Sequence, residues 1–340
     1  MRDNIRFSVI IPVYNAEKTI RFSLNSLQSQ TFENYEAIII DDGSTDRSAK
    51  ICQEFVREDK RFIYYKQKNS GVSIARNFGI SHARGDYIAF LDSDDFYEPE
   101  YLMQFDRLIT MFPEADNFWC GFKAVNNTRM NGNSFVNEVD KEISIERREN
   151  IMSLHKKTLN AALWNKVYKR DVIADNYIEM LPELSLGEDL LFNFEYLDNT
   201  NGKIVILNKT LYGYQCAGGN SLDNRYRKNL KEIYDVIDAR MCEYLNKWNV
   251  SEDQWREYYN AVFFKQEVIL KNTFHPDAKG SFLKKIRKNN KILRSDKFKT
   301  TLYRSNCRIH PMFRKGYESG YYEIVWFAML LANIKKKIIK

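Results

Sequence analysis

The sequence is poor in the features that mark several large protein classes. Its 5 cysteines are odd in number and form no Cys-x-x-Cys pair, which argues against a disulfide framework or a structural zinc site. The longest unbroken apolar run, residues 324–332, is far shorter than the roughly 20 residues that cross a bilayer. The N-terminus lacks the apolar core and cleavage site of a signal peptide. We therefore expect a cytoplasmic protein.

Two nucleotide-binding signatures are also missing. Neither Gly-x-Gly-x-x-Gly nor Gly-Lys-Ser/Thr occurs in the chain. The first motif places a dinucleotide on a helix N-terminus, and the second wraps a glycine-rich loop around nucleotide phosphates. A dinucleotide-binding fold and P-loop phosphoryl transfer are therefore not expected.

Charge is distributed unevenly along the 340 residues. The formal net charge is +7, but residues 226–340 contain 25 Lys and Arg against 12 Asp and Glu. That part is net +13, and residues 1–225 are net −6. With 44% hydrophobic residues the chain is globular, and its length allows two domains. We predict a catalytic domain at 1–225 and a basic helical domain at 226–340.

Short β-rich runs alternate with helical patterns in the first part of the chain. The runs are apolar on both faces, which is typical of strands in a parallel sheet covered by helices on both sides. We therefore predict an α/β fold with a mostly parallel sheet. The expected strands are residues 7–11, 37–40, 61–65 and 87–91, and the expected helices are 18–28, 47–56 and 72–82.

The pattern changes after about residue 113. Helices are predicted near residues 145–154 and at 190–197, and closing strands at 203–207 and 210–214. Beyond residue 224, glycines and β-branched runs become rare, which indicates a smaller α-helical C-terminal domain. Its expected helices are residues 230–245, 255–270, 282–293 and 322–339.

Carboxylates follow the predicted strand at 87–91. Ligands of parallel sheets bind beyond the carboxyl ends of the strands, where Asp92, Asp94 and Asp95 would lie. Clustered carboxylates without His or Cys suit a hard divalent cation, Mg²⁺ or Mn²⁺. A helix N-cap with a turn is the alternative. Three like charges so close together repel one another, which favours the cation.

Two further groups would reach the same edge of the sheet. Asp42, preceded by Asp41, could accept the N–H of a nucleobase such as uracil, or could belong to a turn that caps the next helix. Arg76 lies in the first turns of a predicted helix, where its forked guanidinium could face a nucleotide or diphosphate. A solvated or salt-bridged arginine is the alternative.

The order of these motifs resembles glycosyltransferase family 2. The matching segments are Ser8-Val9-Ile10-Ile11-Pro12-Val13-Tyr14-Asn15, Asp41-Asp42-Gly43-Ser44-Thr45-Asp46, Asn69-Ser70-Gly71-Val72-Ser73 with Ala75-Arg76-Asn77, and Leu91-Asp92-Ser93-Asp94-Asp95. The similarity is close up to about residue 110. It continues more loosely through Trp164-Asn165-Lys166, Gly187-Glu188-Asp189 and Ser221.

The resemblance implies a GT-A fold and a metal-dependent, inverting transfer of a sugar from a nucleoside diphosphate donor, with UDP favoured as the nucleotide. It implies that the nucleotide is bound by Pro12, Tyr14, Asp42, Arg76 and Asp92. Asp94 and Asp92 would hold Mn²⁺ or Mg²⁺.

The catalytic base implied by the resemblance is Asp189. Desolvation and the charge of Glu188 would raise its pKa, although an ordinary acid at a helix N-terminus is the alternative. Lys166 and Glu188 would contact the acceptor or the diphosphate. A solvated surface lysine is the alternative for Lys166.

Basic residues dominate the C-terminal part between Lys279 and Lys315, where 13 Lys and Arg accompany one acid, Asp296. Interleaved apolar residues predict basic amphipathic helices that attract anionic lipid headgroups, with the stretch 326–340 in the membrane interface. A helical subdomain that packs on the catalytic core or forms a homo-oligomer is the alternative. Nucleic acid is disfavoured because no RNA-binding aromatic signature occurs.

The sequence therefore predicts a hexosyl- or N-acetylhexosaminyltransferase that extends a glycan in surface-polysaccharide or glycoconjugate synthesis. The acceptor would be lipid-linked or protein-linked, and the enzyme would contact the inner face of the cell membrane peripherally. Two other classes stay open. One is a noncatalytic module that binds a nucleotide sugar or a lipid surface, and the other is a nucleic-acid binder that uses the basic tail.

Overall fold

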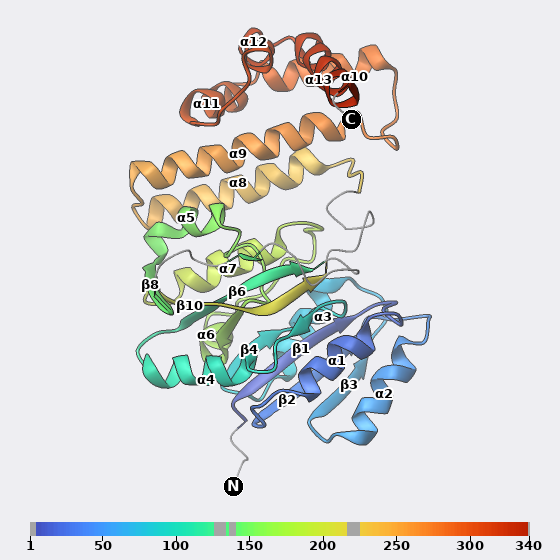
Figure 1. The fold of residues 1–340 in the computed structure, drawn as a ribbon, viewed down its shortest axis with the longest axis vertical. Coiled ribbons are helices and arrows are strands. Elements are labelled where there is room, and N and C mark those ends of the chain that lie inside the picture. Colours follow the sequence, from blue (N-terminus) through green and yellow to red (C-terminus); the bar gives the residue numbers. More distant parts are fainter. Residues whose placement is uncertain (1–4, 126–133, 136–140, 216–224, 339–340) are drawn as a thin grey trace. The chain divides into compact units, whose positions relative to one another are not determined.

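The computed structural model describes residues 5–125, 134–135, 141–215 and 225–338, with side chains for 5–125, 141–215 and 225–330. Ser221 and the side chains of the lysines at 335–337 therefore lie outside the described part. The chain forms two compact units (Figure 1). The first comprises Met1–Ser221 with Asn246–Trp248, and the second Leu222–Leu245 with Asn249–Lys340.

One mixed sheet forms the centre of the first unit in the described residues. Its order is β3-β2-β1-β4-β9-β6-β10-β5, with β7 beside β6 and β8 beside β10. The strands β3, β2, β1 and β4 run parallel, whereas β9 is antiparallel to both of its neighbours. The bounds are β1 (Phe7–Val13), β2 (Tyr35–Asp41), β3 (Phe62–Lys66), β4 (Tyr87–Phe90), β5 (Phe96–Tyr97), β6 (Asn117–Val125), β7 (Ser134–Phe135), β8 (Ile143–Arg147), β9 (Lys166–Lys169) and β10 (Lys203–Gln215).

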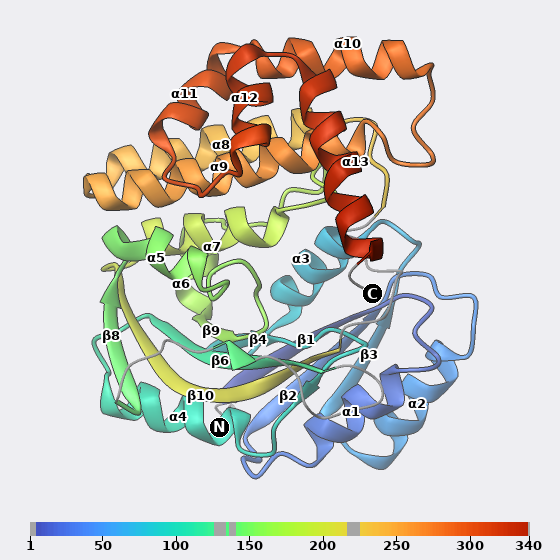
Figure 2. The same cartoon turned by 45° about the horizontal axis from the view of Figure 1, so that its top comes forward.

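Helices cover both faces of this sheet. Every residue of β1 and β2 is buried, as expected for central strands that are packed on two sides. Figure 2 shows α1, α2 and α4 on one face and α3, α6 and α7 on the other. The bounds are α1 (Ile20–Gln28), α2 (Ser48–Glu58), α3 (Val72–His82), α4 (Tyr101–Met111), η1 (Arg148–Asn150), α5 (Ile151–Lys156), α6 (Arg170–Asp175) and α7 (Glu188–Asp198).

Two predictions for the middle of the chain are wrong in detail. The helix expected near 145–154 begins only at Ile151, because the preceding residues form β8 and pair with residues 203–207 of β10. The two closing strands are one long strand, β10, which continues through register shifts between Leu207 and Tyr212. A bulge of this kind keeps a strand in the sheet while changing its pairing, and its sequence resembles a turn.

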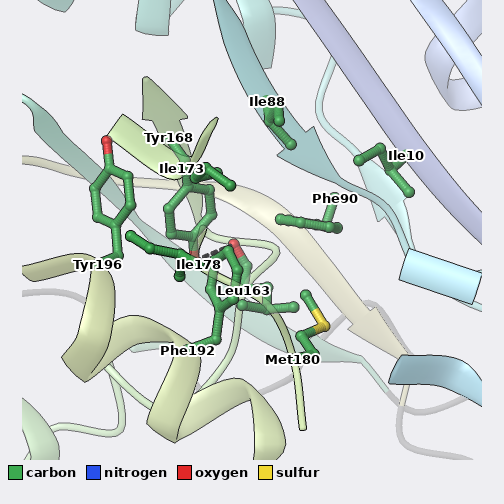
Figure 3. Packing of buried hydrophobic residues seen from close by; sticks show 10 residues of the cluster. All are labelled: Ile10, Ile88, Phe90, Leu163, Tyr168, Ile173, Ile178, Met180, Phe192 and Tyr196. Carbon is green, nitrogen blue, oxygen red and sulfur yellow. Dashed lines mark hydrogen bonds between the residues drawn. The ribbon is translucent and has the colours of Figure 1, made fainter. Parts of the chain in front are cut away.

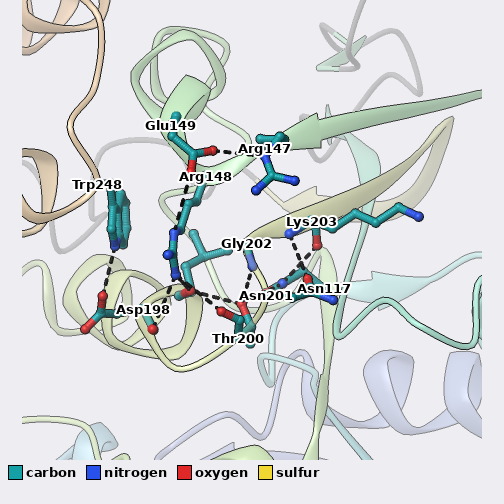
Figure 4. Close-up of polar contacts among 11 residues, drawn as sticks. Asn117, Arg147, Arg148, Glu149, Asp198, Thr200, Asn201, Gly202, Lys203 and Trp248 are labelled. Atoms are coloured by element: carbon teal, nitrogen blue, oxygen red, sulfur yellow. Dashed lines mark hydrogen bonds and ion pairs between the residues drawn. The ribbon is translucent and has the colours of Figure 1, made fainter.

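The C-terminal end of α7 is held by Arg148. Its guanidinium donates to the carbonyl oxygens of Leu197, Asp198 and Thr200 at 3.2–3.3 Å (Figure 4). These contacts satisfy carbonyls that a helix end leaves without partners, and they place a cation at the negative end of the helix dipole.

Trp248 also contacts α7. It stacks on Phe194 and donates to the Asp198 carboxylate. These contacts explain why residues 246–248 belong to the first unit, although the predicted second domain began at residue 226.

The second unit is helical in its described residues. Within it, Asp238 of α8 accepts hydrogen bonds from Lys265 and Lys297, and all three charges are thereby paired. None of the helices in the described part is long and apolar enough to cross a membrane. The bounds are α8 (Leu230–Lys247), α9 (Glu252–Asn272), α10 (Phe282–Leu293), α11 (Asp296–Arg304), α12 (Pro311–Ser319) and α13 (Tyr322–Ile338). No separate bounds were predicted for α11 and α12, which lie in or overlap the basic stretch 279–315 that was expected to form amphipathic helices.

The contact between α3 and β1 yields a prediction for stability. A Cβ at Gly79 would lie 2.5 Å from Cγ2 of buried Ile10. Overpacking costs about 1–3 kcal/mol, and the better helix propensity of alanine offsets about 1 kcal/mol of that. We expect Gly79→Ala to lower the free energy of unfolding in urea. In an Ile10→Ala background, which removes the clash, the same substitution should be neutral or stabilising; an equal loss in both backgrounds would contradict this packing.

Candidate active site

The loops after β1 and β2 are tied together at the carboxyl edge of the sheet. The Asn15 amide donates to Ser44 Oγ at 3.1 Å, and the Asn15 side chain accepts from the Thr45 amide at 2.9 Å. Pro12 is buried near the end of β1, beyond the last residue that pairs with β4, and Tyr14 is half-exposed at 52%. The polar loops after β1 and β2 are thus held together at the carboxyl ends of the parallel strands, where ligands of such sheets bind.

The adjacent carboxylates Asp41 and Asp42 both hold loops in place. Buried Asp41 accepts from the Ser44 amide at 2.7 Å and from the Tyr64 hydroxyl at 2.6 Å. Asp42 accepts from Gln67 and from the amides of Ser70 and Gly71, at 2.7–2.8 Å. Asp42 thus fixes the loop from which α3 starts.

The three acids after β4 have different environments. Asp95 is fully buried, and its carboxylate accepts from the Tyr212 hydroxyl and the Gln215 amide, both at 2.7 Å. Burial and the charges of Asp92 and Asp94 raise its pKa. Asp94 is exposed and Asp92 partly so. The expectation that all three carboxylates serve a cation is therefore wrong for Asp95, which connects the end of β4 to β10.

Arg76 links two of the predicted site carboxylates. From α3, its guanidinium donates to Asp92 at 2.8 Å and to Asp189 at 2.7 Å, and Glu188 lies 3.9 Å away. The side chain is buried, and Nε has no hydrogen-bond partner among the described residues. Burial opposes its charge, but the carboxylates of Asp189 and Asp92 outweigh burial and raise the pKa of Arg76. The salt-bridged alternative considered for Arg76 describes its position in this structure.

Asp189 stands in the first turn of α7. Gly187 precedes that helix with φ +81°, in the left-handed region that favours glycine. Desolvation raises the pKa of Asp189 to about 7, with Arg76 opposing the shift and the charges of Glu188 and Asp92 adding to it. A carboxylate with this pKa can accept a proton near neutral pH.

A hydrophobic core fixes α7 against the sheet. Figure 3 shows Phe192 and Tyr196 of α7 facing Phe90 of β4 and Tyr168 of β9. The rings of Phe192 and Tyr168 meet edge to face at 5.5 Å, and the Tyr168 hydroxyl donates to Asn193 at 2.6 Å. Packing of this density holds side chains in defined positions. The distance between Asp189 and the end of β4 is therefore set by the core.

Lys166 begins β9 beside the end of β4, but its ammonium is bound inside the protein. It is fully buried, and its ammonium donates to the carbonyls of Leu159 and Ala162 and to the side chain of Asn165, at 2.6–2.7 Å. Desolvation lowers its pKa. Both readings from the sequence, a group that contacts the diphosphate and a solvated lysine, are thus at odds with the structure, because all three donors are satisfied inside the protein.

Asp92 and Asp94 fit a divalent cation. Desolvation and the charge of Asp92 raise the pKa of Asp94. The two carboxylates therefore disfavour each other's ionised form, and a cation bound between them would offset this repulsion. Among the described residues, no three His, Cys, Asp or Glu side chains form a closed metal cage. Mg²⁺ is commonly held by one or two carboxylates together with substrate phosphates, so a pair is sufficient.

Two residues near the site were not found from the sequence. Tyr212 donates to Asp95 and stacks on Trp164 with ring centroids 4.2 Å apart. Asn77 exchanges two hydrogen bonds with the backbone of Met180, which joins α3 to the segment before α7. Asn77 directly follows Arg76 in its motif and could have been found from that position. Tyr212 is too distant in sequence from Asp95 for any spacing to reveal it.

Comparison with known proteins gives consistent results. Residues 8–175 match the family described as Glycosyl transferase family 2. The putative glycosyltransferase EpsH of Bacillus subtilis is 31% identical over 82% of this chain and 80% of its own length.

Two solved structures have the same fold. Staphylococcus aureus TarS 1–349 in complex with UDP-GlcNAc aligns with a TM-score of 0.69 at 22% identity, over 94% of this chain and 89% of the other. The mannosyltransferase PcManGT of Pyrobaculum calidifontis, in complex with GDP-Man and Mn²⁺, has a TM-score of 0.51 at 12% identity, over 87% and 83% of the two chains. The predicted α/β fold with a helical C-terminal part is confirmed.

The position of Lys166 yields a second prediction. Lys166→Met should lower the free energy of unfolding by about 1–3 kcal/mol, because buried acceptors lose their donor. UDP affinity, measured by calorimetry on the folded protein, should not change. Lys169→Met on the same strand is the control, since that side chain is 43% exposed and loses only an ion pair with Asp116 at 3.5 Å, so stability should fall by less than about 1 kcal/mol and UDP affinity should not change. A large loss of UDP affinity at unchanged stability would place Lys166 at the diphosphate after all.

Proposed function

This chain belongs to glycosyltransferase family 2, and from that premise we propose that it transfers a sugar from a UDP-sugar to a hydroxyl group of a glycan, with inversion at the anomeric carbon. The observation that carries the proposal is the link through Arg76 between Asp92, at the donor edge of the sheet, and Asp189, whose pKa is raised to about 7. The complex of TarS with UDP-GlcNAc supports the choice of nucleotide.

The donor nucleotide is proposed to bind beyond β1 and β2. Tyr14 contributes exposed aromatic surface, buried Pro12 supports it from the end of β1, and Asp42 lies at the base of the neighbouring loops. Arg76 and Asp92, which are hydrogen-bonded to each other after β4, are proposed to face the phosphates. Binding there uses the open ends of parallel strands, which bring polar groups from several loops to one place.

Asp92 and Asp94 are proposed to hold Mn²⁺ or Mg²⁺ against the donor diphosphate. When bound, such a cation offsets the negative charge that builds up on the leaving diphosphate. Asp94 as a residue is exposed, and the Asp92 side chain retains partial exposure beside Arg76. The Mn²⁺ complex of PcManGT is consistent with this assignment.

Asp189 is proposed as the catalytic base. Inversion requires the acceptor hydroxyl to attack from the face opposite the leaving diphosphate, and a carboxylate near that hydroxyl removes its proton. Arg76 orients the carboxylate by donating to one of its oxygens, which leaves the other to accept the proton. Glu188, in the same turn of α7, is proposed to contact the acceptor. Lys166 has no part in this proposal.

The biological role proposed for the reaction is the extension of a bacterial surface glycan. TarS is named as a poly(ribitol-phosphate) β-N-acetylglucosaminyltransferase, and EpsH as a putative glycosyltransferase. The acceptor, lipid-linked or protein-linked, and peripheral contact with the inner face of the cell membrane remain predictions. The transferred sugar is likewise predicted to be either a hexose or an N-acetylhexosamine.

Release of UDP from a panel of UDP-sugars in the presence of Mn²⁺ tests the proposal. Asp189→Asn should lower the turnover rate by about 10²–10⁴-fold and change UDP affinity far less, because the amide oxygen still accepts from Arg76 but cannot take up the acceptor's proton. Asp94→Asn should lower the turnover rate too, and it should also lose the Mn²⁺-dependent part of UDP binding. Asp171→Asn, an exposed acid on α6, is the matched control and should behave as the unsubstituted protein.

UDP binding without release from any donor, in the presence of plausible glycan acceptors, would show a noncatalytic module instead. Unchanged turnover in Asp189→Asn would remove that residue from the mechanism, and unchanged Mn²⁺ dependence in Asp94→Asn would remove the metal assignment.

The raised pKa of Asp189 predicts the pH dependence. The base accepts a proton only when it is ionised, so kcat/KM should rise about tenfold per pH unit below pH 7 and level off above it. In Asp189→Asn, the residual kcat/KM should no longer rise with pH below pH 7. A profile that is flat from pH 5 to 8 would contradict the assignment of Asp189 as the base.

A further inference from the structure

The second unit contains a cavity of about 350 Å³ that is unrelated to the site on the sheet. Its walls are α9, α12 and α13, and the segment 305–310 between α11 and α12 lies at its rim. Gly316 brings α12 directly against α13, since a Cβ there would lie 2.6 Å from Cγ2 of Val325. This close contact fixes the two helices that form one side of the cavity.

The interior of this cavity is apolar and aromatic. Phe263 and Leu270 of α9 face Tyr317 of α12 and Val325 of α13, and all four are buried. Phe264, beside them on α9, is 63% exposed. Ligand pockets of about 300–1,000 Å³ are lined mainly by such side chains, with few polar groups. An apolar chain is the chemistry that gains most from transfer into this space.

Two cations lie at the rim. Lys271 at the end of α9 and Arg308 in the segment before α12 are both exposed lining residues, and neither side chain makes a hydrogen bond or ion pair among the described residues. The other charged lining residue, Glu267, already accepts from the Tyr317 hydroxyl at 2.7 Å. His310 accepts from the Met312 amide at 3.3 Å. The cavity is therefore lined by two cations without a hydrogen-bond or ion-pair partner and by one carboxylate, which gives a net charge of +1 beside an apolar interior.

We propose that this cavity binds one anionic membrane lipid, with an acyl chain between α9, α12 and α13 and the phosphate at Lys271 and Arg308. Arg binds phosphate oxygens with a fork of donors and Lys as a point charge, so the pair suits a phosphate headgroup. The excess of 25 Lys and Arg over 12 Asp and Glu in residues 226–340 draws this part of the chain to an anionic bilayer. The proposal does not depend on sugar transfer.

Binding of short-chain lipids to the full chain tests the proposal. Calorimetry is carried out with dioctanoyl phosphatidic acid, kept below its micelle concentration and without any sugar donor. Dioctanoyl phosphatidylcholine and inorganic phosphate serve as separate ligands. We expect the phosphatidic acid to bind at least about tenfold more tightly than either, because only it combines an apolar chain with an uncompensated negative charge.

Two variants locate the binding site. Lys271→Gln with Arg308→Gln should weaken phosphatidic acid binding by about tenfold or more. Lys284→Gln with Arg287→Gln removes two exposed cations of α10 that do not line the cavity, and should leave binding within about twofold. Ile309→Trp, which fills the cavity from the rim segment, should abolish the gain in affinity between dibutanoyl and dioctanoyl phosphatidic acid, with circular dichroism confirming the helices.

Four results would overturn the proposal. They are absence of phosphatidic acid binding, equal affinity for inorganic phosphate, equal affinity for phosphatidylcholine, and equal weakening by the two double variants. The second would reduce the site to a general anion site, and the last would reduce it to diffuse attraction by a basic surface. Binding of Mn²⁺ and UDP to the same protein is measured in parallel, so that failure here is distinguished from failure of the glycosyltransferase assignment.

Discussion

A single buried guanidinium connects the parts of the candidate active site. Arg76 comes from α3, Asp92 from the end of β4 and Asp189 from the start of α7, and the three side chains meet within 2.7–2.8 Å. Each carboxylate alone would be costly at such a depth, and the guanidinium alone would be costlier still. The cluster is stable because its charges compensate one another. The cluster also brings Asp92, which is proposed for the donor side, close to Asp189, the proposed base. The charges of Asp92 and Arg76 therefore both act on the pKa of Asp189.

The parallel half of the fold was predictable because its signals are local. Residues 7–11 and 37–40 are apolar on both faces, and the helix expected at 72–82 matches α3 at both ends. Parallel pairing then brings the residues after β1, β2 and β4 to one edge, so Asp42 and Asp92 could be placed there from their order alone. Family membership and fold were therefore accessible from about the first hundred residues.

The remainder depends on contacts between residues that are distant in sequence. The partner of Asp95 is Tyr212, and the acceptors of Lys166 include carbonyls whose positions are set by a turn rather than by a periodic pattern. The strand β8 alternates too briefly to compete with a helical reading until β10 pairs with it. The role of Arg76 as a buried bridge has the same cause, because Asp189 lies 113 positions further along the chain. Charge and spacing placed these groups near a site, but only tertiary packing decides which ones face a ligand and which ones hold the protein together.

The central claim is that the positive charge of Arg76 and the negative charges of Asp92 and Asp189 stabilise one another. A double-mutant cycle, with the free energy of unfolding measured in urea, tests this claim most directly. Arg76→Met alone should cost about 3–5 kcal/mol, because it leaves partly buried carboxylates without their counter-charge. In a background of Asp92→Asn and Asp189→Asn, the same substitution should cost less than half as much. Additive costs in the cycle would contradict the claim, since they would mean that the three charges do not depend on one another.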